Sequence, residues 1–284
     1  MLRVACPGTP RTTPSPGGTV EGIAQAQRLG IQAMEIEWVQ QVPSNVERMR
    51  EIRAAAGSDF ALTVHAPYFI NLNADDEAKK AVSIQRILKA LAMAQHCGAV
   101  SVCVHAAFYL GHPPQRALEN VLRATEEILQ QKKSLFPDVN LAYETMGKPT
   151  QFGTLEELLV VAERFGIYPC VDTAHMHARA NGAVNTAEEW HALLDAYEAA
   201  LGKASLQTMH LHYSGIAYGP KGEKHHLPLR ESDARWQEFL HVLHERNVGG
   251  VLVCESPTME DDTMLLRDTL AAIALRSTAN VAKR

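Results

Sequence analysis

The sequence predicts an α/β protein built as a single (β/α)₈ TIM barrel. The chain has 284 residues, and 46% of them are hydrophobic, which is enough for one large core. Short apolar runs alternate with segments whose apolar residues recur every three or four positions, the spacing of helices. Eight such strand–helix pairs in this length favour a closed barrel over an open sheet.

The expected elements alternate along the whole chain. Strands are expected at residues 2–6, 32–37, 60–65, 99–105, 140–145, 167–172, 206–211 and 249–255. Helices are expected at residues 19–29, 46–56, 76–97, 114–132, 154–165, 187–201, 232–246 and 260–276. Ile84, Leu88 and Leu91 lie on one apolar stripe of the longest helix. Gly98 and Gly166 stand between a helix and the next strand, where a left-handed cap is needed.

The barrel is expected to form one catalytic domain over residues 1–276, followed by a flexible C-terminal tail at 277–284. Three connections, at 7–18, 66–75 and 212–231, are longer than the others. Each follows a strand and therefore lies at the face where barrels carry their active sites. The sequence thus predicts a site at the C-terminal ends of the strands.

Composition limits the function classes. With 27 Lys and Arg against 32 Asp and Glu, the net charge is −5, which argues against a broad basic face for nucleic acid. The net charge does not exclude a nucleic-acid-binding protein whose positive charge comes from bound metal ions. The five cysteines are scattered without a C-x-x-C pair, so reduced thiols and a cytoplasmic location are expected. No apolar stretch approaches the roughly 20 residues of a membrane span, so no membrane partner is expected.

The predicted strand ends concentrate ionisable residues. The eight closing residues are Cys6, Glu37, His65, His105, Glu144, Asp172, His210 and Glu255. Seven are His, Asp or Glu, although the chain has only 13 His and 32 Asp or Glu among its 284 residues. One such residue would be an ordinary hydrogen-bonded strand end. A converging ring of acids and imidazoles, however, requires cations among its members.

These donor types predict a catalytic metal centre. Imidazole and carboxylate without thiolate suit Zn²⁺ or Mn²⁺. Glu144 and Glu255 face each other across the barrel and could bridge two ions, and Asp172-x-x-His175 and Glu223-Lys224-His225-His226 add further donors. This exceeds the needs of one ion, so a multinuclear centre is predicted. Ions about 3.5–4 Å apart activate a water and stabilise both oxygens of a phosphoryl displacement.

Four other ionisable residues are not expected to be metal ligands. His177, His212 and His226 are expected beside the site as supporting partners of the ligands. Glu37 is expected to be a buried ion-pair partner rather than a site residue.

Several motifs resemble those of a known family. His65-Ala66-Pro67-Tyr68-Phe69-Ile70-Asn71-Leu72 resembles the H-x-x-Y-x-I-N-L segment of the endonuclease IV family of apurinic/apyrimidinic (AP) endonucleases. The segments 170–175, 209–211 and 223–226 are similar to the family's later motifs, in order and spacing. The resemblance runs from about residue 1 to 275 and implies a barrel of the xylose-isomerase-like superfamily.

The resemblance implies three Zn²⁺ ions per chain, with Mn²⁺ an alternative at one site. The implied ligand sets are His65, His105 and Glu144; Glu144, Asp172, His210 and Glu255; and His175, Glu223 and His225. The implied reaction is hydrolysis of the phosphodiester 5′ to an abasic site in double-stranded DNA, with Glu255 and Glu144 catalytic. It leaves a 3′-hydroxyl and a 5′-deoxyribose phosphate, as in base excision repair. Blocked 3′ ends are a further implied substrate. Three Zn²⁺ ions would change the charge of −5 to +1.

The resemblance also implies DNA contacts. Tyr68 and Phe69 are expected to wedge into the duplex, and Lys148 and Lys224 to contact backbone phosphates, together with the other basic residues of the rim loops, Arg11, Arg179, Lys221 and Arg230. A monomer is expected, because one face must receive a duplex.

The sequence departs from the family pattern in its rim loops. His212-Tyr213-Ser214-Gly215 stands where many members have Asn-Asp-Ser/Ala-Lys, and Glu223 replaces an aspartate. Two rival functions therefore stay open. One is a divalent-metal sugar isomerase or epimerase on the same barrel, which needs about four ligands, and the other is a lesion-binding module without catalysis.

Overall fold

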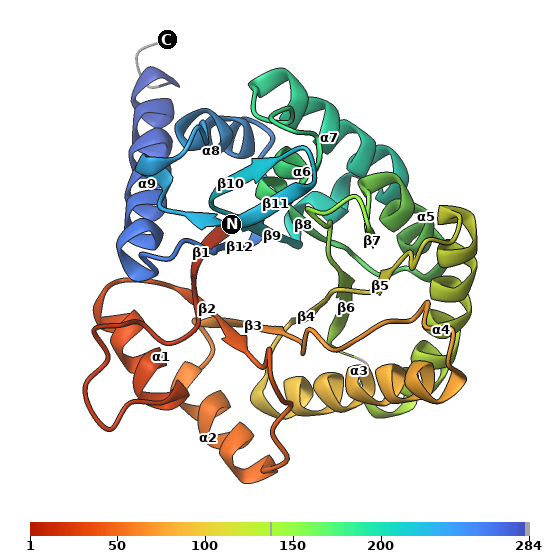
Figure 1. Cartoon of the computed structure of the whole chain (residues 1–284). Coiled ribbons are helices and arrows are strands. Elements are labelled where there is room, and N and C mark those ends of the chain that lie inside the picture. The colour runs from red at the N-terminus through yellow and green to blue at the C-terminus, as the bar shows by residue number, and fades with distance from the viewer. Residues whose placement is uncertain (137, 282–284) are drawn as a thin grey trace.

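The computed structural model, which describes residues 1–136 and 138–281, contains a parallel β-barrel surrounded by helices (Figure 1). Within this described part, eight strands follow the order β6-β4-β3-β2-β1-β12-β9-β8. Their bounds are β1 (Leu2–Pro7), β2 (Ala33–Glu37), β3 (Ala61–His65), β4 (Ser101–Val104), β6 (Asn140–Tyr143), β8 (Cys170–Asp172), β9 (Met209–Tyr213) and β12 (Gly250–Cys254). The prediction of a (β/α)₈ barrel is confirmed.

The helices cover the outside of the barrel and agree closely with the expected segments. They are α1 (Thr19–Arg28), α2 (Val46–Ala56), α3 (Glu77–Cys97), α4 (Pro114–Leu135), α5 (Leu155–Phe165), α6 (Thr173–Arg179), α7 (Ala187–Leu201), α8 (Trp236–Glu245) and α9 (Glu260–Val281). The short helix α6 was not predicted. The expected boundary at residue 276 falls inside α9, and residues 282–284 of the expected tail lie outside the described residues. None of the helices in the described chain combines the length and apolar content needed to cross a membrane.

The barrel closes between β6 and β8 with very little strand pairing. A single bridge joins Glu144 to Cys170. The Thr145 hydroxyl supplements it, because its Oγ1 accepts a hydrogen bond from Asp172 N at 2.8 Å and donates one to Asp172 O at 3.0 Å. A side chain therefore replaces part of the backbone ladder at this seam.

The seventh barrel strand begins and ends later than expected. The sequence suggested 206–211, but Lys203–Gln207 form a 3₁₀ helix that buries Leu206, and β9 runs from Met209 to Tyr213. In the register with β8, His212 is paired with Asp172 and His210 with Cys170. His212, not His210, therefore stands at the level of the predicted site.

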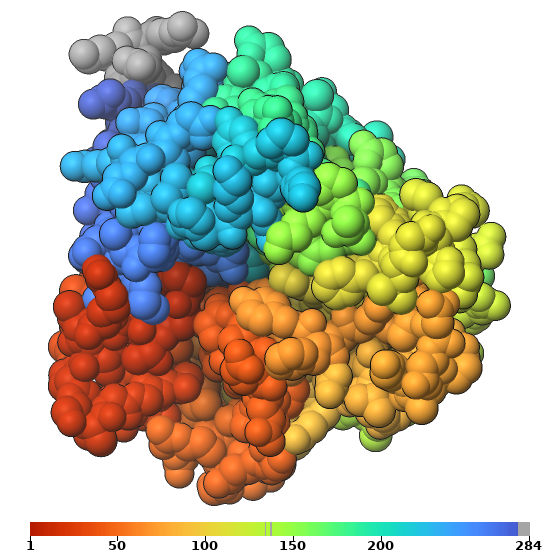
Figure 2. Space-filling view, viewed as in Figure 1, coloured from red at the N-terminus to blue at the C-terminus, as the bar shows by residue number. Residues whose placement is uncertain are grey.

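Two small sheets cover the C-terminal end of the barrel. β5 (Ala107–Phe108) pairs with β7 (Gln151–Phe152), and β10 (Gly215–Gly219) forms a hairpin with β11 (Gly222–Leu227) that crosses the barrel end (Figure 1). Gly222 has φ +87°, and a Cβ there would collide with the carbonyl oxygen of Gly147, so glycine lets the hairpin pack on the β6–β7 loop. Figure 2 shows the surface recessed between this hairpin and the N-terminal segments.

Candidate metal centre

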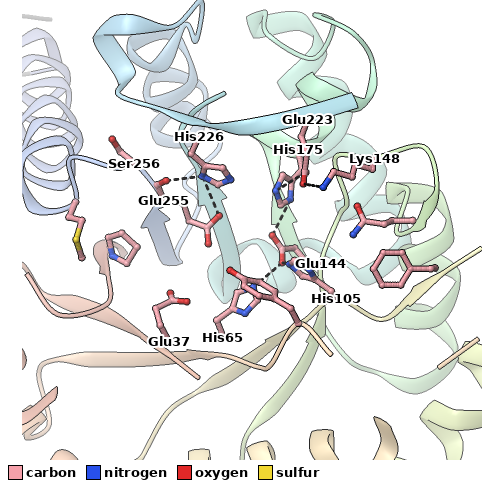
Figure 3. Close-up of a pocket in the computed structure, with 15 residues that line it drawn as sticks. Glu37, His65, His105, Glu144, Lys148, His175, Glu223, His226, Glu255 and Ser256 are labelled. Carbon is pink, nitrogen blue, oxygen red and sulfur yellow. Dashed lines mark hydrogen bonds and ion pairs between the residues drawn. The ribbon is translucent and has the colours of Figure 1, made fainter. Parts of the chain in front are cut away.

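A pocket of about 560 Å³ opens at the C-terminal end of the barrel, beneath the β10–β11 hairpin. Its polar lining comes from segments far apart in the sequence: Glu37, His65, His105, Glu144, Lys148, Gln151, His175, Glu223, His226, Glu255 and Ser256 (Figure 3). Most of the ionisable residues that the sequence placed at the strand ends therefore do converge.

Glu144, at the end of β6, is the centre of this convergence. His65 Nε2 and His105 Nε2 lie 3.4 Å and 2.8 Å from its Oε2. His175 Nδ1 and His212 Nδ1 lie 3.2 Å and 3.3 Å from its Oε1. One buried carboxylate thus has two imidazoles beside each of its oxygens, and a donor set of this size would suit more than one cation.

A second group of donors continues from Glu144 across the barrel. Glu144, Asp172, His212 and Glu255 each offer one ligand atom within 4.8 Å of the others. His210 was expected in this group and is not part of it. His210 and His212 point to the same face of β9, but they belong to successive layers of the barrel interior, and the alternation of a strand cannot distinguish layers.

His210 instead belongs to a buried network one layer down, which the sequence reasoning missed. Glu35, in the middle of β2, has its Oε2 2.9 Å from His210 Nε2 and its Oε1 3.0 Å from His212 Nε2. His210 Nδ1 lies 3.0 Å from Ser101 Oγ. The sequence analysis did not single out Glu35 because this residue does not end a strand. A charged residue inside an otherwise apolar run is the sequence feature that could have indicated a buried polar role for it.

The hairpin supplies donors from above. Glu223 Oε2 lies 3.2 Å from His175 Nε2, as expected. His225, however, is exposed, and His226 lines the pocket with its Nδ1 2.8 Å from the carbonyl oxygen of Glu255. The cause is a β-bulge: Tyr218 pairs with Glu223 and Ala217 with His225, so Lys224 is an extra residue. The bulge places Glu223 and His226 on the same face of β11.

The hydrogen-bond pattern fits cations among these residues. His65 Nδ1 lies 2.8 Å from Ala66 O and His175 Nδ1 lies 3.0 Å from Thr145 O, so each Nδ1–H donates to a backbone carbonyl. The Nε2 lone pairs then face carboxylates. In addition, Glu144 Oε1, Asp172 Oδ2, His212 Nδ1 and Glu223 Oε2 are buried without a well-formed hydrogen bond within the described structure. Carboxylate oxygens and imidazole nitrogens whose lone pairs face one another are stable when cations lie between them.

Burial and neighbouring charges shift the carboxyl pKa values of this centre in opposite directions. Burial, with the nearby charges of Glu35 and Glu255, raises the pKa of Glu37 to about 8. Burial also raises the pKa of Asp172 to about 6, against the pull of His175. For Glu255, burial is outweighed by His212 and His226, which lower its pKa to about 2. These shifts favour the ionised form of Glu255 and the protonated form of Glu37 at neutral pH.

The rim carries both exposed aromatics and basic residues. Tyr68 and Phe69, after β3, are 47% and 58% exposed. Lys148 Nζ lies 3.3 Å from Glu223 Oε1, and Lys224 is exposed.

Two of the three rim arginines, Arg179 and Arg11, have internal partners. The Arg179 guanidinium donates to the carbonyls of Met146, Lys148 and Gln151, and Arg11 pairs with Asp261 at 2.5 Å. These arginines hold loops together. Lys221, at the turn of the hairpin, and Arg230, in the 3₁₀ turn that follows it, are exposed.

Sequence comparisons relate this chain to known proteins. An uncharacterized protein of Methanocaldococcus jannaschii is 35% identical over 240 residues, which are 84% of this chain and 87% of that protein. A protein named probable endonuclease 4, from Mycoplasma pneumoniae, is 28% identical over 210 residues, 71% of this chain and 70% of that protein.

Solved structures show the same fold. Endonuclease IV of Thermus thermophilus matches with a TM-score of 0.68 and 22% identity, covering 96% of this chain and 99% of that one. A D-tagatose 3-epimerase-like protein matches with a TM-score of 0.71 and 16% identity, covering 98% and 99%.

The resemblance to endonuclease IV proteins seen in the sequence is thus confirmed at the level of relatives and fold. The profile of one family, described as xylose isomerase-like TIM barrel, matches residues 23–277. The chain belongs to the xylose isomerase-like TIM barrel family.

Proposed function

We propose that this chain is a DNA-repair endonuclease that hydrolyses the phosphodiester 5′ to an abasic site in double-stranded DNA. The observation that carries the proposal is the crowding of four imidazoles around Glu144, two on each oxygen. Such a donor surplus exceeds the needs of one ion and suits the multinuclear centre of a phosphodiesterase. The similarity to proteins named probable endonuclease 4 supports the same activity.

The residues group into three ligand sets. The first is His65, His105 and Glu144, and the second is Glu144, Asp172, His212 and Glu255; the ligand atoms of each lie within 4.8 Å of one another. The third pairs His175 with Glu223 at 3.2 Å, and we assign His226 to it because it lines the same pocket. His212 and His226 take the places first given to His210 and His225. Imidazole and carboxylate donors suit Zn²⁺ throughout, and the carboxylate-rich second set also suits Mn²⁺. When bound, such ions lower the pKa of water and neutralise charge on a phosphodiester.

The chain's own groups orient the reactants. Glu255 is ionised and lies at the pocket wall, so its carboxylate can accept a hydrogen bond from the attacking water and fix its direction. Glu144 holds the two halves of the centre at a fixed separation. Tyr68 and Phe69 extend from the rim, where they would occupy the gap left by the missing base. Lys148 and Lys224 would contact backbone phosphates.

The remaining assignments follow from this function. One open face that receives a duplex suits a monomer, and blocked 3′ ends present the same phosphodiester chemistry to the centre. All five cysteines are free thiols, which suits a cytoplasmic location.

A sugar epimerase is the second candidate, and one observation favours it. The set Glu144, Asp172, His212 and Glu255 contains two glutamates, an aspartate and a histidine, which suffice for a single divalent ion. That reaction has no use for the pairing of His65 and His105 on Glu144 or of His175 with Glu223. The nuclease explains these residues and the epimerase does not.

The test is incubation with a duplex that contains one tetrahydrofuran abasic analogue, without added Mg²⁺, followed by analysis of the product ends. Incision on the 5′ side with a 3′-hydroxyl is expected, because this analogue cannot be cut by β-elimination. A fully metal-loaded protein that leaves the duplex intact would contradict the proposal. Turnover of a ketose by the same sample would then support the epimerase.

A further inference from the structure

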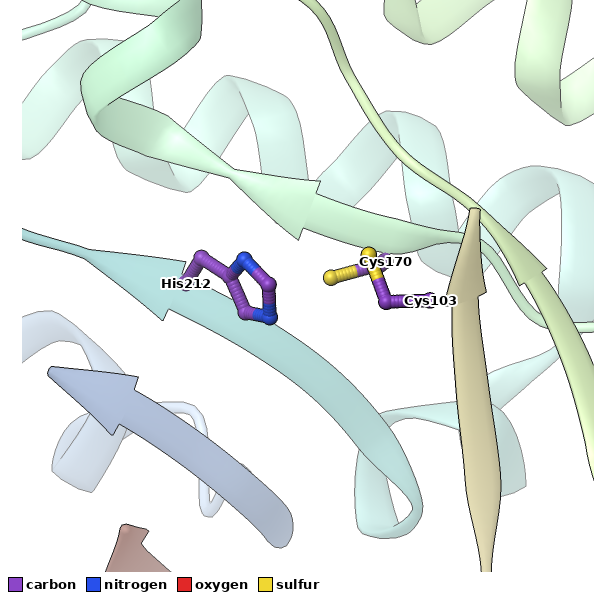
Figure 4. A group of neighbouring side chains, drawn as sticks. All are labelled: Cys103, Cys170 and His212. Carbon is purple, nitrogen blue, oxygen red and sulfur yellow. The ribbon is translucent and has the colours of Figure 1, made fainter. Parts of the chain in front are cut away.

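Two cysteines of the barrel interior meet a histidine of the metal centre. Cys103 on β4, Cys170 on β8 and His212 on β9 point toward one another (Figure 4). Each offers one ligand atom within 4.8 Å of the other two. All three residues are fully buried, with 0% exposure. Strands distant in the sequence thus bring two thiols and an imidazole to one point.

The surroundings of these thiols differ from an apolar packing layer. Barrel interiors are normally filled by bulky branched residues. Here Cys103, Cys170 and Ala142 form a small cluster of their own, separate from the two large hydrophobic clusters. The Cys103 thiol donates to Glu144 Oε2 at 3.1 Å. The thiols therefore touch the polar centre directly.

We propose that Cys103, Cys170 and His212 form a binding site for a thiophilic metal ion, of the class of Cd²⁺, Cu⁺ or Zn²⁺. Two thiolates and an imidazole favour such soft or borderline ions and exclude Mg²⁺ and Ca²⁺. Glu144 Oε2, beside Cys103 Sγ, supplies a fourth donor, so the site completes the four-coordinate shell that these ions accept.

The site shares two residues with the centre above it. His212 and Glu144 belong both to the thiol group and to the group with Asp172 and Glu255. An ion held by the thiols draws these donors away from the upper layer. The barrel interior is therefore a place where thiophilic ions compete with the ions of the pocket and inhibit whatever reaction they support.

The direct test is spectroscopic and uses the full chain. The protein is stripped with a chelator, kept reduced with a phosphine, and titrated with Cd²⁺ while the thiolate-to-metal charge-transfer absorption is followed. The wild type is expected to develop this band, and Cys103→Ser and Cys170→Ser to lose most of it. Cys97→Ser is the matched control, because the Cys97 thiol only donates to Ala94 O within α3. Binding of Cd²⁺ without the band, or a band unchanged in both serine variants of the site, overturns the proposal.

A second measurement needs no variant. X-ray absorption at the cadmium edge of the wild type, loaded with one equivalent of Cd²⁺, is expected to show sulfur in the first shell. A shell of nitrogen and oxygen alone contradicts the site even if the serine variants fail to fold. Both readouts are independent of DNA. A sulfur shell without incision counts against the nuclease only, and incision without a sulfur shell counts against this site only.

Discussion

Glu35 Oε1 lies 3.0 Å from His212 Nε2, while the other nitrogen of that imidazole faces Glu144 and Glu255 at 3.3 Å. Glu35 is completely buried, and neither of its oxygens has a well-formed hydrogen bond within the described structure, so the neighbouring imidazoles compensate its charge. The Nδ1 edge of His212 is the one directed at the carboxylates of the centre. A buried acid behind an imidazole is the arrangement that orients histidine ligands and raises their basicity.

Glu35→Gln is expected to weaken metal binding by roughly 10- to 100-fold, because the amide keeps the shape but loses the charge that orients His212. Zinc affinity, measured by competition with a chromophoric chelator, checks this. Glu51→Gln, on the exposed face of α2, is the control. Equal affinities in the wild type and the Glu35 variant would show that His212 needs no support from Glu35.

His226→Ala and His225→Ala are expected to differ although the residues are neighbours. The bulge at Lys224 turns His226 into the pocket and leaves His225 exposed. His226→Ala should lose about one metal ion per chain and most of its activity, in keeping with the loss of an inner ligand. His225→Ala should retain both. Metal analysis by mass spectrometry decides, and the opposite pattern would restore His225 as the ligand.

Glu255→Gln is expected to reduce incision by at least about 100-fold with the fold intact, since it removes both a ligand and the group that orients the water. Incision of the tetrahydrofuran duplex is the measurement, with circular dichroism as the test of folding. Glu231→Gln, an exposed carboxylate of the same rim, should leave the rate unchanged. A near-normal rate in Glu255→Gln is incompatible with the proposed role.

Tyr68→Ala is expected to weaken binding to an abasic duplex by about 1–3 kcal/mol, the contribution of one stacked aromatic side chain. The metal content should not change. Fluorescence anisotropy with abasic and intact duplexes measures the effect, and the loss should be confined to the abasic one. Unchanged affinity would mean that Tyr68 only packs against its loop.

The fold could be predicted because its signals are local. Alternating apolar runs and helical stripes located the barrel strands, and the glycine caps marked the helix ends. The strand ends also located His65, His105 and Glu144 correctly in the pocket. Their placement required only that parallel strands end on one face of a barrel.

The expectations that differ from the structure depend on register. His210 was expected because residues 209–211 resemble the family motif and a strand was expected at 206–211, whereas Leu206 belongs to a 3₁₀ turn and β9 begins at Met209. His225 was expected from the resemblance of residues 223–226 to the family motif, whereas a bulge in β11 places His226 in the pocket lining, and bulges leave little trace in a single sequence. Sequence patterns indicate well which face of a strand a residue occupies. They do not indicate at which layer of the barrel interior it lies, or where a bulge inserts a residue.

The weakly paired junction of β6 and β8 links the fold to its ligands. Glu144 lies on one side of this junction and Asp172 on the other, and one backbone bridge and the side chains of Thr145 and Asn140 join the two edges. An ion held by both carboxylates would hold the two edges together. Opening of the barrel at this junction would then require release of the ion. The amide of Thr145 should therefore exchange with solvent hydrogen more slowly when the ion is bound.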